Sequence, residues 1–333
     1  MKSRFLLTLL AAAAATVGAM GQNAVPEDAI NGLFSVSADR QVYFAKGNLQ
    51  CSGVQSGNYT WSFAENQYDM LGRANRVYNS ETNKYDLADK IDLFCYSSDC
   101  ENIRFGISMD VDRYHYQGNF VDWGTNTIGK HAPNTWRTPK GEEWEYLLKK
   151  RTNHDKLFGV AAIATATSTI NGMIFLPDNW QCPEGITFKS GLTTEDPERE
   201  EYSYAKFQKF TLEQWQKMEA AGAIFLPAAG IYCGSYGNYL GIRGYYQSCD
   251  IPERLYVLIN CLYYSYENAY LDDRMTASDA MPVRLVQDRK QSGIGTITST
   301  VDDANKARKI IRDGQILIVR NGHTYNLQGM EVE

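Results

Sequence analysis

Apolar and polar positions in this chain alternate over short stretches more often than they follow the period of a helix. Residues 34–37 and 41–44 place apolar side chains at every second position on the two sides of a short turn, which predicts a β-hairpin. Residues 59–63 predict a further strand, and residues 281–286 predict a last one. Residues 64–135 are rich in Asn, Asp, Gly and Tyr with weak periodicity, so they are interpreted as long loops with short strands.

Two segments carry the signals that start a helix. The first is expected to begin at Thr138 as its N-cap, with Pro139 at the first helical position and two glutamates in the first turn. Acids are favourable there because the N-terminus of a helix is positive. The buried face of this helix is predicted to consist of Trp144, Leu147 and Leu148.

The second helix is expected to begin at Thr211, where Gln214 three residues later completes a capping box. Gly222 fits the position just after the end of this helix. The side chains expected to face the core are Leu212, Trp215 and Met218.

Each predicted helix is followed, directly or after a loop, by an apolar strand, and the two strands resemble each other in sequence. Residues 172–177 and 222–227 share the pattern G-x-I-F-L-P. This is a short local similarity and not the repeat of a solenoid protein. Pro177 and Pro227 are expected to end these strands, because proline has no N–H to donate to a β-ladder.

The order of these elements resembles the C-type-lectin-like domains found in exported proteins of Bacteroidota, and the related Fibrobacter major paralogous domain. The segments that carry the resemblance are residues 42–50, 61–68, 121–124, 136–138, 143–147, 223–230, 244–246 and 283–286. The resemblance implies an α+β domain over residues 32–287, with two helices packed on short antiparallel sheets and long loops between them. One departure is at residues 247–249, which read Gln-Ser-Cys where the family usually has Trp-Ser-Ser.

The last part of the chain is predicted to be separate. Residues 288–305 are polar and are interpreted as a linker, and residues 306–333 as a small three-stranded meander with turns at Asp313-Gly314 and Asn321-Gly322. From Lys309 onward the sequence resembles C-terminal sorting tails of the same phylum, which implies secretion machinery as a partner. The alternative is an accessory β-unit packed on the main domain.

Residues 1–21 have the pattern of a secretory signal peptide. Lys2 and Arg4 precede an apolar stretch from Phe5 to Val17, and small residues at 19 and 21 place the expected cleavage before Gln22. The apolar stretch is too short to span a bilayer, and the rest of the chain contains none of transmembrane length. The protein is therefore expected to be exported to the cell surface, the extracellular medium or the periplasm.

The composition narrows the classes of ligand. The formal net charge is −6, and loss of the leader's two basic residues would make it more acidic. An acidic chain without a basic block is a poor candidate for binding nucleic acid. No metal or cofactor is expected, because metal-binding spacings, nucleotide-binding loops and hydrolase motifs are all absent from the sequence.

Seven cysteines leave two interpretations open. They are Cys51, Cys95, Cys100, Cys182, Cys233, Cys249 and Cys261. They can be buried free thiols, or some can pair in an oxidising compartment, as Cys95 with Cys100 or among the last three. A family related by fold makes formylglycine with paired cysteines, so an enzyme of that type using Cys233 and Cys261, or an unrecognised hydrolase, is the alternative to a binding protein.

Carboxylates occur in clusters that could be taken for catalytic groups. Glu142, Glu143 and Glu145 lie close together in the sequence, as do Asp272 and Asp273. Acidic runs at these spacings are more often solvated faces than catalytic dyads, and we interpret them in that way.

Tyrosine is the unusual feature of the composition. Ten of the 22 tyrosines lie between residues 232 and 270, with Gly, Ser and Asn between them. Tyrosine offers a large contact area at low entropic cost and is common on binding surfaces. Tyrosine is also an ordinary strand residue, so the alternative is that these side chains belong to the core.

We predict a non-catalytic binding or adhesion module for a glycan or protein ligand, with its site on a loop surface in this region. The expected ligand-binding residues are Tyr236, Asn238, Tyr239, Arg243, Tyr245, Tyr246, Tyr264, Tyr266 and Asn268. The row 262, 264, 266, 268, 270 is expected on one face of a single strand.

Overall fold

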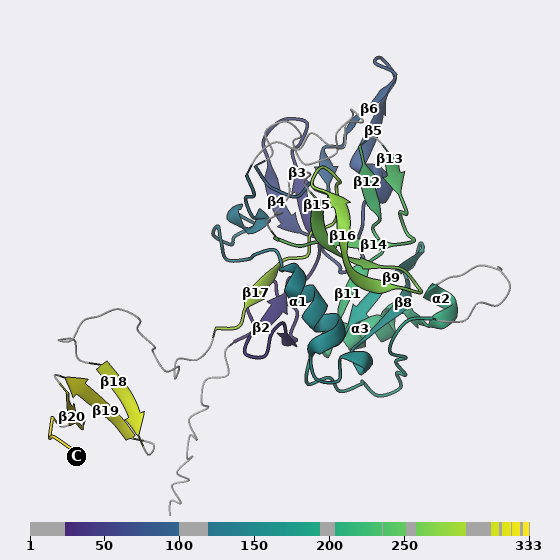
Figure 1. Cartoon of the computed structure of the whole chain (residues 1–333). Helices are drawn as coiled ribbons and strands as arrows, with labels where there is room; N and C mark the ends of the chain where they lie inside the picture. The colour runs from purple at the N-terminus through teal and green to yellow at the C-terminus, as the bar shows by residue number, and fades with distance from the viewer. Residues whose placement is uncertain are drawn as a thin grey trace, which may run out of the picture. The chain divides into compact units, whose positions relative to one another are not determined.

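A computed structural model of the chain separates it into two compact units (Figure 1). One unit is residues 24–289, and the other contains residues 290–333 with the first 23. The residues that the structure describes are 24–99, 119–193, 204–234, 236–250, 258–290, 308–312, 315–320, 322–326 and 329–332. The predicted leader, most of the predicted linker and Cys100 therefore lie outside the described residues.

The predicted α+β fold, with two helices packed on short antiparallel sheets, is wrong. The described residues are mainly β-strands in seven small sheets, and the helices are short. The helical segments are α1 (Gly141–Glu145) with its π-helical continuation η4 (Tyr146–Lys150), α2 (Tyr204–Phe207) and α3 (Leu212–Ala220). Capping residues mark where a helix starts but do not set its length, and the segments interpreted as loops also form strand pairs, such as Arg76–Asn79 with Lys84–Leu87.

The start of α3 is as predicted. Thr211 Oγ1 accepts a hydrogen bond from the backbone N–H of Gln214 at 3.2 Å, and Gln214 Oε1 accepts one from the backbone N–H of Thr211 at 2.9 Å. Gly222 follows the end of the helix with φ of +98°, a conformation that glycine adopts without strain. Trp215 and Met218 are fully buried, which confirms their place in the core.

The first helix begins later than predicted, at Gly141 instead of Pro139. Its N-terminus is capped by side chains that are not the expected Thr138. Asp250 accepts from the backbone N–H of Gly141 at 3.0 and 3.2 Å, and Glu143 accepts from the backbone N–H of Lys140 at 2.8 Å. The cap supplied by Asp250 comes from 109 residues away, so no local pattern could indicate it.

The largest sheet contains both segments with the G-x-I-F-L-P pattern. Its order is β10 (Lys209–Thr211), β8 (Phe158–Ala164), β9 (Thr169–Phe175) and β11 (Ile224–Pro227), and the two G-x-I-F-L-P segments pair antiparallel as β9 and β11. Residues from alternate positions enter two different core clusters, one of which includes the buried face of α3. Both faces are thus covered, which is why these strands are continuously apolar.

The predicted hairpin is present and joins the two ends of the body. β1 (Phe34–Ser35) and β2 (Gln41–Phe44) pair, and β17 (Val286–Asp288) lies on the other side of β2. The closing strand thus begins at Val286 instead of residue 281. The preceding residues form an isolated β-bridge between Met281 and Phe94 and single hydrogen bonds, such as that from the N–H of Leu49 to the carbonyl of Val283 at 2.9 Å.

The region from 49 to 91 contains more strands than its composition indicated. β3 (Leu49–Ser52) pairs with the predicted strand, observed as β4 (Thr60–Phe63), and with β7 (Lys90–Ile91). β5 (Arg76–Asn79) and β6 (Lys84–Leu87) form a hairpin that projects from the body (Figure 1). Short 3-10 turns lie at Gly72–Asn75, Trp123–Thr125 and His154–Lys156.

The segment expected to be a long binding loop is mostly strands. β12 (Ile231–Cys233) and β13 (Tyr236–Asn238) form one hairpin. β14 (Gly244–Gln247), β15 (Leu258–Tyr264) and β16 (Ala269–Thr276) form a three-stranded antiparallel sheet. One face of this sheet packs on the same core as β8, β9 and β11, and the other faces β12.

The predicted C-terminal meander is confirmed. β18 (Arg308–Arg312), β19 (Gln315–Arg320) and β20 (His323–Tyr325) pair antiparallel in sequence order. Asp313, Gly314 and Asn321, to which the turn predictions refer, lie outside the described residues. Within the described part of the chain, the helices are all too short or too polar to cross a membrane.

Candidate ligand pocket

The pairing register of β14, β15 and β16 sorts the tyrosines into two groups. Tyr245 lies opposite Tyr263, which lies opposite Tyr270, so three tyrosines cross the sheet in one row on one face. Their neighbours Tyr246 and Tyr264 point to the other face and are fully buried. This alternation follows from the two-residue period of a strand.

The rings of the row contact one another. The centroids of Tyr245 and Tyr263 are 5.2 Å apart with an interplanar angle of 63°, and those of Tyr263 and Tyr270 are 4.8 Å apart at 40°. Tyr239 extends the row, with its centroid 6.4 Å from that of Tyr245. Aromatic pairs at these separations stabilise one another's positions, so the row forms a continuous aromatic wall.

A tight turn brings a cation against this wall. Tyr239 has φ of +56°, and its carbonyl accepts hydrogen bonds from the N–H groups of Ile242 at 2.9 Å and Arg243 at 3.0 Å. The turn places the guanidinium carbon of Arg243 3.9 Å from the ring centroid of Tyr239 and 5.9 Å from that of Tyr263. Both distances are within the range of cation–π attraction.

A second charged group closes the other end of the row. Asp272 is 3% exposed and accepts two hydrogen bonds from the guanidinium of Arg274, at 2.9 Å from Nε and 3.1 Å from Nη2, and a third from the backbone N–H of Arg274 at 3.0 Å. Arg274 Nη2 also donates to the hydroxyl of Tyr270 at 3.0 Å. The sequence reading of Asp272 as part of a solvated face is therefore wrong, because this carboxylate is buried and paired.

These residues enclose a pocket with a volume of about 360 Å³. Small-molecule sites usually have about 300–1,000 Å³ and combine apolar walls with a few polar groups. The aromatic wall is formed by Tyr239, Tyr245, Tyr263 and Tyr270, the polar groups are Asn238, Arg243, Asp272 and Arg274, and the remaining lining is Ile231, Cys233 and Met275.

Burial acts on the pKa of two phenols and of one guanidinium in the pocket. Burial raises the pKa of Tyr245 and of Tyr270 above the ordinary phenol value. Burial opposes the charge of Arg243, but a hydrogen bond with Tyr245 and the surrounding phenol oxygens outweigh it and raise the pKa of Arg243. Tyr245 and Tyr270 therefore present neutral hydroxyls next to the charged guanidinium of Arg243.

Four of the nine predicted ligand-binding residues line this pocket, namely Asn238, Tyr239, Arg243 and Tyr245. Tyr246 and Tyr264 do not reach it. Both are fully buried, and their hydroxyls donate to the backbone carbonyls of Pro227 and Leu226.

The other three predicted residues lie outside the pocket lining. Tyr236 is 66% exposed on β13, and Tyr266 is half-buried with its ring 6.3 Å from that of Tyr204. Asn268 is exposed in the turn after β15, where its carbonyl accepts from the N–H of Ser265 at 2.8 Å. The expected single-face row from 262 to 270 does not exist, because β15 ends at Tyr264 and the chain turns.

Several lining residues were not predicted from the sequence. Tyr263 and Tyr270 belong to the tyrosine-rich segment but were not among the predicted binding residues. Tyr270 was expected in one row with Tyr264, whereas it lies opposite Tyr263. Asp272 and Arg274 were not connected with this segment. The repeated Tyr-Tyr pairs at 245–246 and 263–264 were the available signal, since in a paired sheet each pair sends one ring to each face.

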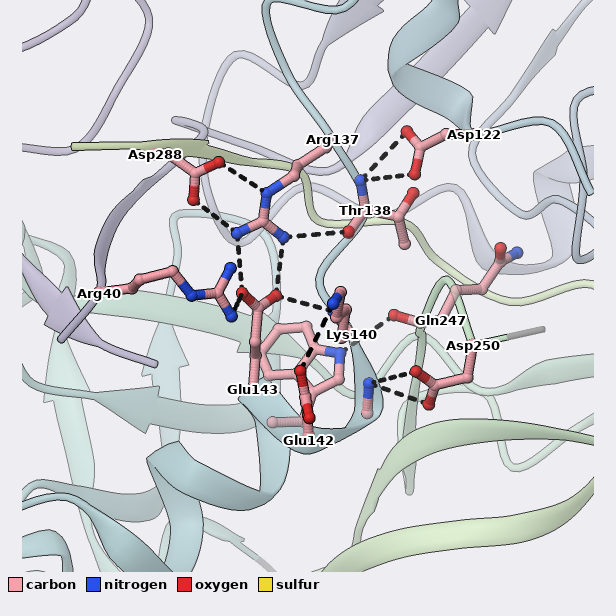
Figure 2. Close-up of polar contacts among 12 residues, drawn as sticks. Arg40, Asp122, Arg137, Thr138, Lys140, Glu142, Glu143, Gln247, Asp250 and Asp288 are labelled. Carbon is pink, nitrogen blue, oxygen red and sulfur yellow. Dashed lines mark hydrogen bonds and ion pairs between the residues drawn. The ribbon is translucent and has the colours of Figure 1, made fainter. Parts of the chain in front are cut away.

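A second polar cluster lies at the start of α1 (Figure 2). The guanidinium of Arg137 donates to both oxygens of Glu143 at 2.7 and 2.8 Å, and also binds Asp288 at 2.7 and 3.1 Å. Arg40 approaches Glu143 at 3.2 Å. Glu143 is fully buried, which corrects its assignment to a solvated face. Its carboxylate is saturated by arginines and by the backbone, so this cluster stabilises the fold and offers no free acid.

Cys249 and Cys261 are thiols that burial makes less acidic. Cys51, Cys182, Cys249 and Cys261 are free thiols, and because Cys249 and Cys261 are free, the proposed pairings among the last three cysteines are not formed. Burial raises the pKa of Cys249 to about 12 and holds that of Cys261 well above the ordinary thiol value. A thiol becomes nucleophilic when its pKa is lowered, and here the shifts have the opposite sign.

Within the described residues, groups of three or more His, Cys, Asp or Glu side chains suited to a metal ion are also absent. Comparison of the chain with protein-family models, with curated proteins and with solved structures gives no match. Kinship with exported proteins of Bacteroidota stays a prediction from the segments quoted above.

Proposed function

We propose that this protein is an exported, non-catalytic binding or adhesion module whose ligand site is the tyrosine pocket between β12–β13 and the sheet β14–β15–β16. Export follows from the leader pattern of residues 1–21, and delivery to the surface from the sorting-like pattern of residues 306–333. The ligand is a glycan or a small exposed part of another protein.

The observation that carries this proposal is the aromatic row with its cation. Four tyrosines and Arg243 meet in one open pocket of about 360 Å³. Tyrosine and arginine are enriched where binding energy concentrates, because their rigid planar groups lose little entropy on contact. Three of these tyrosines stand on paired strands, so the site is held by the sheet and needs little ordering when a ligand arrives.

The test begins with the full chain on glycan and protein arrays. For each ligand found, Tyr239→Ala is compared with Tyr236→Ala. Both changes remove an exposed tyrosine near the same hairpin, at 44% and 66% exposure, but only Tyr239 lines the pocket. Loss of about 2 kcal/mol, or about thirtyfold in affinity, is expected for Tyr239→Ala. Tyr236→Ala should bind as the parent does.

Melting temperatures separate binding from folding in this comparison. Both tyrosines are exposed, so both variants should melt within a few degrees of the parent protein. Equal affinity of the two variants for every ligand, or an array without any ligand, contradicts the assignment of the pocket.

A further inference from the structure

The pocket carries an unbalanced positive charge, although the chain as a whole has a net charge of −6. Its lining contains two arginines and one aspartate. Asp272 is engaged by Arg274 through two hydrogen bonds, so these two charges compensate each other. Arg243 contacts tyrosine rings and a phenol, and among the described residues it has no carboxylate at ion-pair distance.

The position of Arg243 favours an anion over a cation as ligand. Clusters of aromatic rings often bind quaternary ammonium groups through their faces. Here the guanidinium of Arg243 already lies 3.9 Å above the ring of Tyr239, so the chain's own cation takes that place. A second cation would be repelled by it, whereas an anion would be attracted.

The stacked guanidinium also suits a carboxylate in particular. Its N–H donors lie in the plane of the group, at the rim, when the face is occupied by a ring. A carboxylate accepts two parallel hydrogen bonds from such a rim, a geometry that a lysine could not provide. The single contact with Tyr245 leaves other donors of Arg243 for a ligand.

The rest of the lining fits a small ring with hydroxyl groups. The volume of about 360 Å³ lies at the lower end of the range for small-molecule pockets, which favours one ring with its substituents. Tyr239 is 44% exposed and Tyr270 is half-buried, so their rings offer apolar contact to the C–H groups of a sugar. The phenols and Asn238 offer hydrogen bonds to its hydroxyls.

We propose that the pocket binds a carboxylate-bearing sugar residue, with the carboxylate on the guanidinium of Arg243 and the ring against the tyrosine row. This inference rests on the proposed function and gives its site a ligand class. A neutral sugar would use the same wall but leave Arg243 without its partner.

The experiment titrates the full chain by calorimetry with short oligosaccharides that contain galacturonate, glucuronate or N-acetylneuraminate. Each is compared with its methyl ester, which keeps the size of the ligand and removes its charge. At least one acid should bind about 10- to 100-fold more tightly than its ester, the factor expected for a hydrogen-bonded charge.

Substitutions of Arg243 test whether this side chain causes the preference for the acid over the ester. Arg243→Gln should lower the affinity for the acid more than that for the ester, so that the preference for the acid is lost, and Arg243→Lys should restore only part of the preference. The matched control is Arg73→Gln, which removes the same charge from an exposed position outside the pocket lining and should keep the preference. Thermal melting checks that each variant is folded.

Two results overturn the inference. One is equal binding of acid and ester by the parent protein, including the case in which neither binds. The other is a preference for the acid that survives Arg243→Gln. The proposed function is judged separately: if a neutral glycan or a protein binds and Tyr239→Ala removes that binding, the pocket is a ligand site and only the acidic class is wrong.

Discussion

Replacing Glu143 by glutamine tests whether the cluster at the start of α1 holds the two ends of the body together (Figure 2). The carboxylate is fully buried and accepts hydrogen bonds from Arg137 at 2.7 and 2.8 Å and from the backbone of Lys140 at 2.8 Å. Arg40 on the approach to β2 and Asp288 on β17 complete the cluster. Glutamine keeps the shape but turns an NH₂ group toward arginine donors.

The expected loss in free energy of unfolding follows from the burial of Glu143. Removing one partner of a buried ion pair costs about 3–5 kcal/mol, because the other charge stays behind unpaired. The side chains of Arg137 and Arg40 are 26% and 40% exposed to solvent, and Arg137 still pairs with Asp288. Water and this carboxylate therefore offset part of the cost. We therefore expect the free energy of unfolding to fall by about 2–3 kcal/mol, or about 5–10 °C in melting temperature.

Thermal and urea unfolding of the full chain measure this change, with Glu145→Gln as the matched control. Glu145 lies two residues away and pairs with Lys149 and Lys150 at the surface, where such pairs contribute about 0–1 kcal/mol. The double variant Arg137→Met/Glu143→Met should lose less than the sum of its single changes. Equal losses for Glu143→Gln and Glu145→Gln would refute the reasoning.

Three further predictions concern other parts of the chain. Burial raises the pKa of Asp92 to about 6, above the usual range of an aspartate, so the folded state holds the proton more tightly than the unfolded chain. The free energy of unfolding should therefore rise by about 1 kcal/mol when the pH falls from 7 to 5. Asp92→Asn should remove that increment in urea titrations; an unchanged pH dependence would contradict the assignment. Arg284→Met should lower the free energy of unfolding by at least about 3 kcal/mol, because it leaves buried acceptors without their donor. The guanidinium is fully buried and donates to the side chains of Asn48 and Gln67 and to the carbonyls of Ala45 and Phe225. A smaller loss in melting experiments would show that these acceptors find other partners. Deleting residues 306–333 should leave the melting transition of the body intact and change where the protein is found after cell fractionation, and loss of the cooperative transition would make the meander part of the fold.

Local chemistry in the sequence determined the features that need only neighbouring residues. The capping box of Thr211 and Gln214 set the start of α3, because both partners lie within one turn. The hairpin of β1 and β2 and the three-stranded meander at the C-terminus were also predictable, since alternation and short turns specify them. The shared pattern of residues 172–177 and 222–227 identified two strands, but it did not show that these strands pair with each other.

Tertiary structure decided which tyrosines face the pocket. Tyr245 and Tyr246 are adjacent and chemically identical, yet one lines the pocket and the other is fully buried in the core. The choice depends on the register between β14 and β15 and on which face of that sheet meets β8, β9 and β11. A one-residue shift in register would exchange the two faces, and the pairing partners are separated by loops whose length does not fix that register. The sequence could therefore locate the tyrosine-rich segment, but only packing against the rest of the body determined that Tyr245, Tyr263 and Tyr270 line the pocket.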